Sequence, residues 1–339
     1  MLPVTLQDLR AAADRIAAAT VRTPLLPLTL AGEGALGRAG EVYLKAENLQ
    51  RTGSFKLRGA YNFLASLADE VRARGVVTHS SGNHAQGVAC AAALLGVRAT
   101  IVIPENAPRV KVERTRAWGA EIIRCENSSA AREETAQALA HAHGYSLVPP
   151  FDHPWIVAGQ GTVGLEIAAA LPDVANVLVP LGGGGLLAGV SLAISELCPA
   201  AQLLGVEPEL AADGRASLAS GRLQTWSAAA TSRTLADGVR TQRLGELTFN
   251  ILRERVAGVV TVSEAAIGAA TRALALEARL VAEPTGALSL AAYRRLLAGA
   301  VDGLELRPGP TVLVLSGGNV DPRLLAELLN AGDTAGLEG

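Results

Sequence analysis

Short apolar runs alternate with amphipathic helical patterns along most of this chain. The runs are rich in Val, Ile and Leu, which is typical of strands buried in a parallel sheet. They lie at residues 42–46, 75–80, 100–104, 120–124, 146–148, 176–181, 202–206 and 311–316. The spacing of apolar residues between them predicts helices at 6–16, 56–67, 85–95, 108–118, 129–143, 159–171, 186–197, 246–255, 264–280 and 284–297, and residues 213–240 are expected to be loop-rich.

The regular alternation of strand and helix predicts an α/β fold with two lobes, each a mostly parallel sheet flanked by helices. A chain of 339 residues is long enough for two such lobes. The lobes are expected to meet near residues 65–75 and 145–152. The large domain would then be discontinuous, with residues 1–68 and 148–330, and the small domain would contain residues 69–147.

The composition supports a large folded enzyme and excludes several other classes. Hydrophobic residues make up 49% and charged residues 18% of the chain, so a large core is available. The formal net charge is −2, without a basic block, which argues against nucleic acid or an anionic membrane as a partner. No apolar run is long enough to span a membrane, and charged residues near the N-terminus exclude a signal peptide. The scattered residues Cys90, Cys125 and Cys198 are typical of a reducing compartment, so we expect a cytoplasmic protein.

Lys56 stands at an unusual position for a lysine. It follows a predicted strand, a turn at Gly53 and a candidate N-cap at Ser54, so it is expected in the first turn of a helix. The positive end of the helix dipole disfavours an ammonium group there by up to about 1 kcal/mol. A lowered pKa and a neutral amine are what Schiff-base chemistry requires of a lysine. The alternative interpretation is a surface lysine without a chemical role.

Two further turns follow predicted strands and carry polar residues. The turn Ser80-Ser81-Gly82-Asn83-His84 precedes a predicted helix, whose first N–H groups can bind a carboxylate or a phosphate. The alternative is a plain helix-capping turn. In the turn that begins at Ser316, the hydroxyl can hydrogen-bond a ring nitrogen, or the segment forms a simple turn.

The glycine run Gly182-Gly183-Gly184-Gly185 joins an apolar strand to a predicted helix. Such a turn lets the backbone approach a phosphate closely. Gly183, Gly185 and Ala188 also fit the dinucleotide pattern G-x-G-x-x-A, with Glu207 about 20 residues further on, so a nicotinamide-dependent dehydrogenase is an alternative of a different class. Ligands of α/β sheets bind at the carboxyl ends of strands, so these turns and Lys56 are expected to face one crevice.

Together these stretches closely resemble the fold-type II pyridoxal-phosphate (PLP) enzymes, which are built like the tryptophan synthase β subunit. The resemblance is to the serine/threonine dehydratase and serine racemase group in particular. It covers nearly the whole chain in family order, whereas the dinucleotide alternative explains only the glycine run. The matching segments are Ser54–Ala60, Ser80–Gln86, Ala158–Thr162, Gly182–Gly185, Ala236–Val239, Glu283–Thr285 and Ser316–Asn319.

The resemblance implies a role for each matching residue. Lys56 forms the Schiff base with the cofactor and abstracts the substrate's α-proton, Phe55 packs beside the cofactor ring, and Ser316 pairs with its pyridine nitrogen. The large domain binds the cofactor, and the small domain is a mobile substrate domain. The ring hydroxyl is hydrogen-bonded by Asn83, the phosphate is held by Gly182, Gly183, Gly184, Gly185 and Leu186, and the substrate carboxylate is bound by Ser80, Ser81, Gly82, Asn83 and His84.

The resemblance also implies an activity, namely an L-serine/L-threonine dehydratase that gives a 2-oxo acid and ammonia. Serine racemase as the main activity and dehydration of threo-3-hydroxyaspartate are open alternatives. Ser81 would return a proton opposite the lysine in a racemase, or it would only bind the carboxylate. The chain ends soon after its last predicted helix, so we expect the short catabolic type without a regulatory domain, and a homodimer as in relatives.

A divalent cation site is implied as well. Glu207 and Asp213, with the carbonyl of Ala211 between them, match the ligands of the racemase-like members, and oxygen ligands suit Mg²⁺ or Ca²⁺. The alternative is two solvated acids in a loop. Glu283 is expected near the cofactor pocket without an assigned role. Arg132 matches a position near the substrate in some members, but it is left out because its surroundings, residues 128–131, are too variable.

Overall fold

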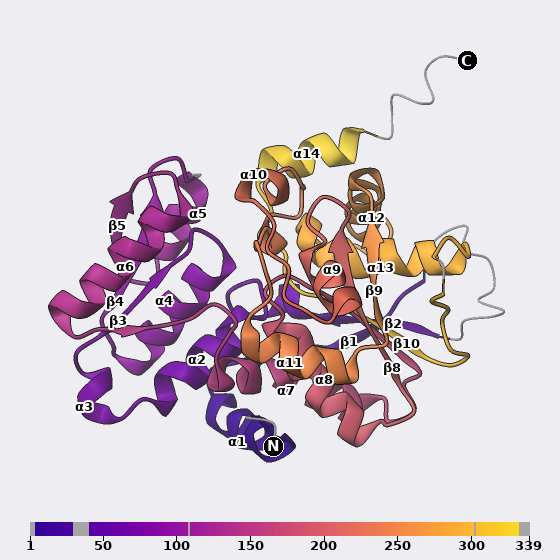
Figure 1. Ribbon diagram of the computed structural model, residues 1–339, viewed down its shortest axis with the longest axis horizontal. Helices are drawn as coiled ribbons and strands as arrows, with labels where there is room; N and C mark the ends of the chain where they lie inside the picture. The colour runs from indigo at the N-terminus through magenta and orange to yellow at the C-terminus, as the bar shows by residue number, and fades with distance from the viewer. Residues whose placement is uncertain (1–3, 30–40, 108, 302, 332–339) are drawn as a thin grey trace.

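The computed structural model of this protein describes residues 4–29, 41–107, 109–301 and 303–331. Within them the strands form two sheets, in which every neighbouring pair is parallel except β1 and β2. The two sheets belong to two lobes, with the small lobe on the left in Figure 1, which confirms the predicted fold class. The larger sheet has the order β1 (Leu25–Pro27), β2 (Val42–Ala46), β10 (Thr311–Leu315), β7 (Asn176–Pro180), β8 (Gln202–Pro208), β9 (Gly258–Val262), and the smaller has β5 (Glu121–Cys125), β4 (Ala99–Pro104), β3 (Val76–His79), β6 (Ser146–Leu147).

Helices cover both faces of the large sheet, which explains why its central strands are mostly apolar. On β7, Val177 and Val179 pack into the core on one face, while Leu178 packs into the core on the other. Successive side chains of a strand point to opposite faces, so burying both faces requires an unbroken apolar run. The first face is covered by α1 (Leu6–Ile16), α7 (Pro154–Ala170), α8 (Gly185–Leu197) and α11 (Glu246–Arg255), the second by α12 (Glu264–Leu276) and α13 (Pro284–Leu297).

The helix α2 (Lys56–Ser66) lies where the two lobes meet. Its Leu57 and Leu64 belong to the apolar core of the small sheet. Its Gly59 lies against α7, so close that a Cβ there would be 2.5 Å from Gln160 Nε2. The helix that begins at Lys56 therefore contacts both lobes. The small sheet is otherwise covered by α4 (Asn83–Leu95) and α5 (Arg109–Arg116) on one face and α6 (Ser129–His143) on the other.

Two predicted helix boundaries differ from the structure by four residues or more. The helix α7 begins at Pro154 rather than at Gly159, because His153 caps it and proline suits the first position of a helix. The helix α12 ends at Leu276 rather than near residue 280, and Arg279 just beyond it has a left-handed φ of 59°.

Residues 213–240 were expected to be loop-rich, but they also contain short helices, and several other short elements had not been predicted.

No helix in the described ranges is long and apolar enough to cross a membrane. The division at residues 68 and 148, and the mobility of the small domain, stay predictions. The elements that sequence reasoning missed are β1, β9, η1 (Glu47–Leu49), α3 (Asp69–Arg72), α9 (Asp213–Ser220), α10 (Ala228–Thr231), η2 (Asp237–Val239) and α14 (Pro322–Asn330).

Candidate active site

A cavity of about 1040 Å³ is lined by residues from both lobes. It lies at the carboxyl ends of β3, β7 and β10, and all the strand-to-turn junctions singled out in the sequence contribute to it. Its size is typical of a small-molecule site. The predicted metal ligands Glu207, Ala211 and Asp213 do not line it. Every predicted cofactor and substrate residue does: Phe55, Lys56, Ser80, Ser81, Gly82, Asn83, His84, Gly182, Gly183, Gly184, Gly185, Leu186 and Ser316.

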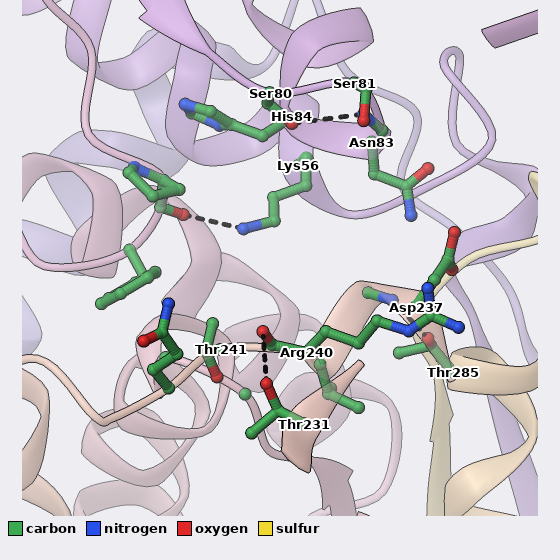
Figure 2. A pocket seen from close by; sticks show the side chains of 18 of the residues that line it. Lys56, Ser80, Ser81, Asn83, His84, Thr231, Asp237, Arg240, Thr241 and Thr285 are labelled. Carbon is green, nitrogen blue, oxygen red and sulfur yellow. Dashed lines mark hydrogen bonds between the residues drawn. The ribbon is translucent and has the colours of Figure 1, made fainter. Parts of the chain in front are cut away.

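The Lys56 amine points into this cavity, where it donates a hydrogen bond of 2.8 Å to the carbonyl oxygen of Pro150 (Figure 2). Lys56 is the first residue of α2, as predicted. Burial lowers the pKa of its ammonium group from 10.5 to about 8. The place of Lys56 on the helix predicts a lowered pKa through the helix dipole, whereas loss of hydration is the cause that the structure supports.

The start of α2 is joined to the end of β10. Phe55 N donates to the carbonyl oxygen of Ser316 at 3.2 Å, and Ser54 forms an isolated β-bridge with Gly317. The prediction that Ser54 caps α2 is wrong, because Phe55 is the N-cap residue and no side chain caps the helix. Ser316 Oγ is buried and has no hydrogen-bond partner among the described residues. This hydroxyl lines the cavity close to the segment that carries Lys56, and it can pair with a ligand.

The turn from Ser80 to His84 leads into α4, which begins at Asn83, two residues before the predicted start at residue 85. Gly82 N donates to Ser80 Oγ at 3.2 Å, which holds the turn in a compact form. The first N–H groups of a helix have no partners within the helix, and those of α4 start at the cavity. His84 Nε2 lies 3.1 Å from the carbonyl oxygen of Val148, and burial together with the Lys56 charge lowers the pKa of His84 to about 3. His84 is therefore a neutral imidazole tied to the backbone.

The glycine run forms a side-chain-free cradle at the start of α8. Gly184 has a φ of 93°, which favours glycine over other residues. A Cβ on Gly183 would lie 2.3 Å from the ring of Phe151, and one on Gly185 would lie 3.0 Å from Phe151 Cβ. Only glycine fits here without moving Phe151. The helix begins at Gly185, so backbone N–H groups and the positive dipole end meet at the cavity, as an anion site requires.

Two contacts at the cavity and one further lining residue were not predicted. Glu283 accepts a hydrogen bond of 2.7 Å from Asn83 Nδ2, and burial together with the Asp237 charge raises the pKa of Glu283 to about 7. Lys111 of α5 forms an ion pair with Asp237 of η2, which joins the small lobe to the large lobe. Arg132, which the sequence analysis left out, also lines the cavity. Asp237 and Glu283 lay in segments already singled out, but Lys111 gave no signal.

The predicted metal ligands are buried rather than solvated, so the alternative of two exposed acids is wrong. Glu207 and Asp213 are each 1% exposed. Burial and the Asp213 charge raise the pKa of Glu207 well above its ordinary value, and burial raises the pKa of Asp213 to about 7. Asp213 Oδ2 has no hydrogen-bond partner among the described residues. Within those residues there is no group of three or more Asp, Glu, His or Cys side chains that could hold a metal, so any site here would rest on two carboxylates and a backbone carbonyl.

Glu207 does not act as the acidic residue of a dinucleotide site. Its two oxygens accept hydrogen bonds from Gly214 N at 2.9 Å and Arg215 N at 2.8 Å, in the first turn of α9. The carboxylate caps that helix inside the protein and is not exposed to a ribose. The dehydrogenase alternative therefore loses the residue that its pattern requires.

The fold and the cavity define an α/β enzyme in which a buried lysine amine and a glycine cradle share one cleft. The sequence profile described as "Pyridoxal-phosphate dependent enzyme" matches residues 16–317. The chain belongs to this family, which confirms the resemblance drawn from the sequence.

The relatives fall in the predicted group of ammonia-lyases and racemases. An L-threo-3-hydroxyaspartate ammonia-lyase from Saccharomyces cerevisiae is 43% identical over 332 residues, which cover 97% of this chain and 98% of the relative. A solved threonine deaminase from the organism abbreviated T.th. is 48% identical with a TM-score of 0.85, covering 94% of this chain and 99% of that chain. A serine racemase from Dictyostelium discoideum is 37% identical with a TM-score of 0.84, covering 94% of this chain and 99% of that chain.

The residues present fit the cofactor of this family. Lys56 is a buried amine with a lowered pKa, and the glycine turn brings the backbone N–H groups at the start of α8 to the cavity. Ser316 offers a buried hydroxyl without a partner in the part of the chain that the structure describes. An aldehyde, a phosphate and a ring nitrogen on one small molecule would satisfy all three.

Proposed function

We propose that this protein is a PLP-dependent ammonia-lyase that converts L-serine and L-threonine into a 2-oxo acid and ammonia. The observation that carries the proposal is the Lys56 amine, which lies inside the cavity with a pKa of about 8. A general base works best when its pKa lies near the working pH. The dehydratase and racemase relatives support the choice of small hydroxy amino acids as substrates.

Each predicted cofactor contact has a counterpart in the cavity. Lys56 would hold the aldehyde covalently, Phe55 would flank the ring, Asn83 would bond the ring hydroxyl, and Ser316 would pair with the ring nitrogen. The phosphate would rest on the backbone of Gly182, Gly183, Gly184, Gly185 and Leu186. When bound, the cofactor supplies an electron sink for the negative charge that develops at the substrate α-carbon.

The protein would then bind, orient and deprotonate the substrate. The turn from Ser80 to His84 would hold the carboxylate with backbone N–H groups beside the start of α4. The Lys56 Nζ would take the α-proton, since a pKa of about 8 leaves a useful fraction of neutral amine at neutral pH. The β-hydroxyl would then leave as water by taking up the proton that Lys56 Nζ removed, and the released enamine would be hydrolysed by water to the 2-oxo acid and ammonia. A closed cavity would keep bulk water from the reacting atoms.

Racemisation of serine is a second candidate activity, which the presence of Ser81 favours. Ser81 lines the cavity on the same turn that would bind the carboxylate. Its hydroxyl would return a proton to the face of the α-carbon opposite Lys56. The serine racemase relative supports this assignment, whereas a role in carboxylate binding alone would give a dehydratase only.

The substrate threo-3-hydroxyaspartate is an alternative that the yeast relative favours. A second substrate carboxylate needs a cationic partner, and the cavity is lined by Lys111, Arg132 and Arg240. Lys111 also pairs with Asp237, and each of the three cations is a candidate for that partner. Assays on both kinds of substrate separate it from the main proposal.

We further propose that Glu207, Asp213 and the Ala211 carbonyl hold Mg²⁺ or Ca²⁺. The support is the raised pKa of both acids and the unpartnered Asp213 Oδ2, because a cation would relieve two buried carboxylates that repel each other. Such a site would steady the start of α9 and would lie apart from the reacting atoms.

We also propose a homodimer in the cytoplasm. Leu49 and Val281 are 47% and 50% exposed, and Asn48 Nδ2 donates to the Val281 carbonyl at 3.1 Å, so these apolar side chains come from adjacent segments. A second copy of the chain would cover them. The buried, unpaired cysteines support a reducing compartment. Analytical ultracentrifugation of the purified protein tests the dimer.

The experiment that tests the activity incubates the PLP-loaded protein with L-serine, L-threonine and L-threo-3-hydroxyaspartate in separate reactions. The 2-oxo acid, ammonia and D-serine are measured in each. Oxo acid and ammonia in equal amounts from serine or threonine are expected, and none from the Lys56→Ala variant. Turnover of hydroxyaspartate alone would support the alternative substrate, and no oxo acid from any of the three would refute the proposed lyase activity.

A further inference from the structure

Arg58 is the largest fully buried side chain in the described part of the chain, and it lies two residues after Lys56. Its guanidinium is held on two sides by carboxylates. It donates to both oxygens of Glu47 at 2.8 Å, and to the two oxygens of Glu166 at 2.7 and 3.0 Å. Nothing in the proposed reaction uses this residue, yet such paired, two-pronged bonds are the most geometrically exacting contacts that an arginine makes.

The clamp around Arg58 joins four elements. Glu47 belongs to η1, Arg58 to α2 and Glu166 to α7, and Lys45 of β2 also bonds Glu166. Two cations balance two carboxylates. Burial alone would raise the pKa of Glu47, but Arg58 and Lys45 lower it, so the carboxylate stays charged. Buried ion networks are weak sources of net stability compared with apolar packing, which leaves a role in fixing geometry.

The geometry of a helix relates this clamp to Lys56. Residues of an α-helix are separated by about 100° around the axis, so Arg58 and Lys56 project about 200° apart, on opposite sides of α2. Holding the guanidinium on one side therefore sets the direction of the amine on the other. No side chain caps the start of α2, and the clamp on Arg58 supplies side-chain hydrogen bonds that hold its first turn.

The partner of the Lys56 amine depends on the same elements. Pro150, whose carbonyl accepts from Lys56, lies just before α7, the helix that carries Glu166. Helices α2 and α7 touch through glycines, and a Cβ on Gly159 would lie 2.6 Å from the Arg58 carbonyl oxygen. The backbones are in close contact, so a rotation of α2 cannot be absorbed by flexible side chains.

We propose that Arg58 is a positioning residue, which fixes the rotation of α2 through Glu47 and Glu166 and so aims the Lys56 amine into the cavity. The proposal rests on the role proposed for Lys56. It assigns the network a function in the reaction beyond the stability of the fold.

The test compares variants of the PLP-loaded enzyme. In Arg58→Lys the charge stays but the two-pronged bonds are lost, and Glu166→Gln removes one carboxylate with little change of shape. The control is Lys45→Met, which disturbs the same network from β2 and leaves both carboxylates on Arg58. For each variant we would measure kcat, KM, the pH dependence of kcat, the melting temperature and the retention of bound cofactor after gel filtration.

Arg58→Lys is expected to lower kcat by about tenfold to a hundredfold with KM nearly unchanged, because a misplaced base costs rate rather than binding. The pH at which kcat rises should also be higher in this variant, because an amine that is no longer buried regains a pKa closer to 10.5. Glu166→Gln should show the same changes to a smaller degree. Lys45→Met should lower the melting temperature while kcat and the pH profile stay as in the wild type.

Equal losses of kcat in all three variants, or an unshifted pH profile in a folded Arg58→Lys, would overturn the proposal. If Arg58→Lys does not fold, the comparison of kcat and the pH profile between Glu166→Gln and Lys45→Met tests the proposal instead. If the wild-type protein makes no oxo acid, the proposed lyase activity fails, and cofactor retention still tests Arg58. Loss of retention in Arg58→Lys and Glu166→Gln but not in Lys45→Met would support the proposal, and equal retention would overturn it.

Discussion

Asn83 donates a hydrogen bond of 2.7 Å to Glu283 and accepts one of 2.8 Å from Asn319. The amide is therefore fixed in one orientation, because its oxygen is taken by Asn319. Its Nδ2 carries two N–H groups, of which Glu283 takes one, and the second can donate into the cavity. Glu283 thus orients the residue that we propose for the cofactor ring hydroxyl, from a buried position on the opposite lobe.

The raised pKa of Glu283 predicts a pH-dependent stability. Its pKa is about 7 in the folded protein against 4.5 in the unfolded chain, so its contribution is fully present below about pH 4.5 and is lost as the pH rises through 7. The shift corresponds to up to about 3 kcal/mol. When the pH is raised from 5 to 8, the unfolding free energy measured with urea should fall less in Glu283→Gln than in the wild type. The difference between the two falls should be at most about 3 kcal/mol. Parallel curves for the two proteins would contradict the prediction.

Ser81→Ala is expected to change the products formed from L-serine. If Ser81 returns the proton on the second face, D-serine formation should fall by about a hundredfold while pyruvate formation falls much less. The matched control is Ser80→Ala, which removes a hydroxyl from the same turn and should leave the product ratio unchanged. Chiral chromatography and an oxo acid assay give the ratio. An unchanged ratio in Ser81→Ala would assign that residue to carboxylate binding alone.

A divalent cation should stabilise the protein through Asp213 and Glu207. The two buried carboxylates repel each other when both are ionised, so Mg²⁺ or Ca²⁺ at about 100 times its dissociation constant should add about 2.7 kcal/mol to the unfolding free energy. EDTA should reverse the effect, and Asp213→Asn should abolish it. The exposed neighbour Glu209 serves as a control, and Glu209→Gln should keep the response. A melting temperature that does not respond to either metal would rule out the site.

Ser316 should influence how the enzyme divides substrate between elimination and racemisation. A neutral hydroxyl holds a ring nitrogen protonated less strongly than a carboxylate would, so Ser316→Asp should raise the ratio of D-serine to pyruvate. The variant places an acid where the native side chain is 1% exposed, so it should also lower the melting temperature. Ser316→Asn is the control for size. No change in the ratio for a folded Ser316→Asp would count against this role.

The main lines of the fold and the cavity were predictable because they depend on local chain properties. The apolar runs at β7 and β10 specify strands buried on both faces. The turns at Ser80 and Gly182 follow strands directly, so the parallel sheets bring them together at one edge of each lobe.

The remaining features depend on contacts between distant segments. The hydrogen bond of Asn83 to Glu283 and the ion pair of Lys111 with Asp237 join the two lobes, and no local pattern specifies them. The lowered pKa of Lys56 was expected from its place on a helix, but its cause is burial, which depends on the whole cavity. β1 was missed because it has only three residues, whereas β9, with the sequence GVVTV, carried a strand signal that was overlooked between two helices.

The aromatic ring of Phe151 occupies the volume that a side chain at position 183 would need. Positions 151 and 183 therefore share a single space, so we expect the sizes of their side chains to be inversely linked among homologues. A homologue with a side chain at position 183 must have a smaller residue at position 151, or a different conformation of the loop before α7. Substitution at only one of these two positions should be rare in homologues that keep the conformation of this glycine turn.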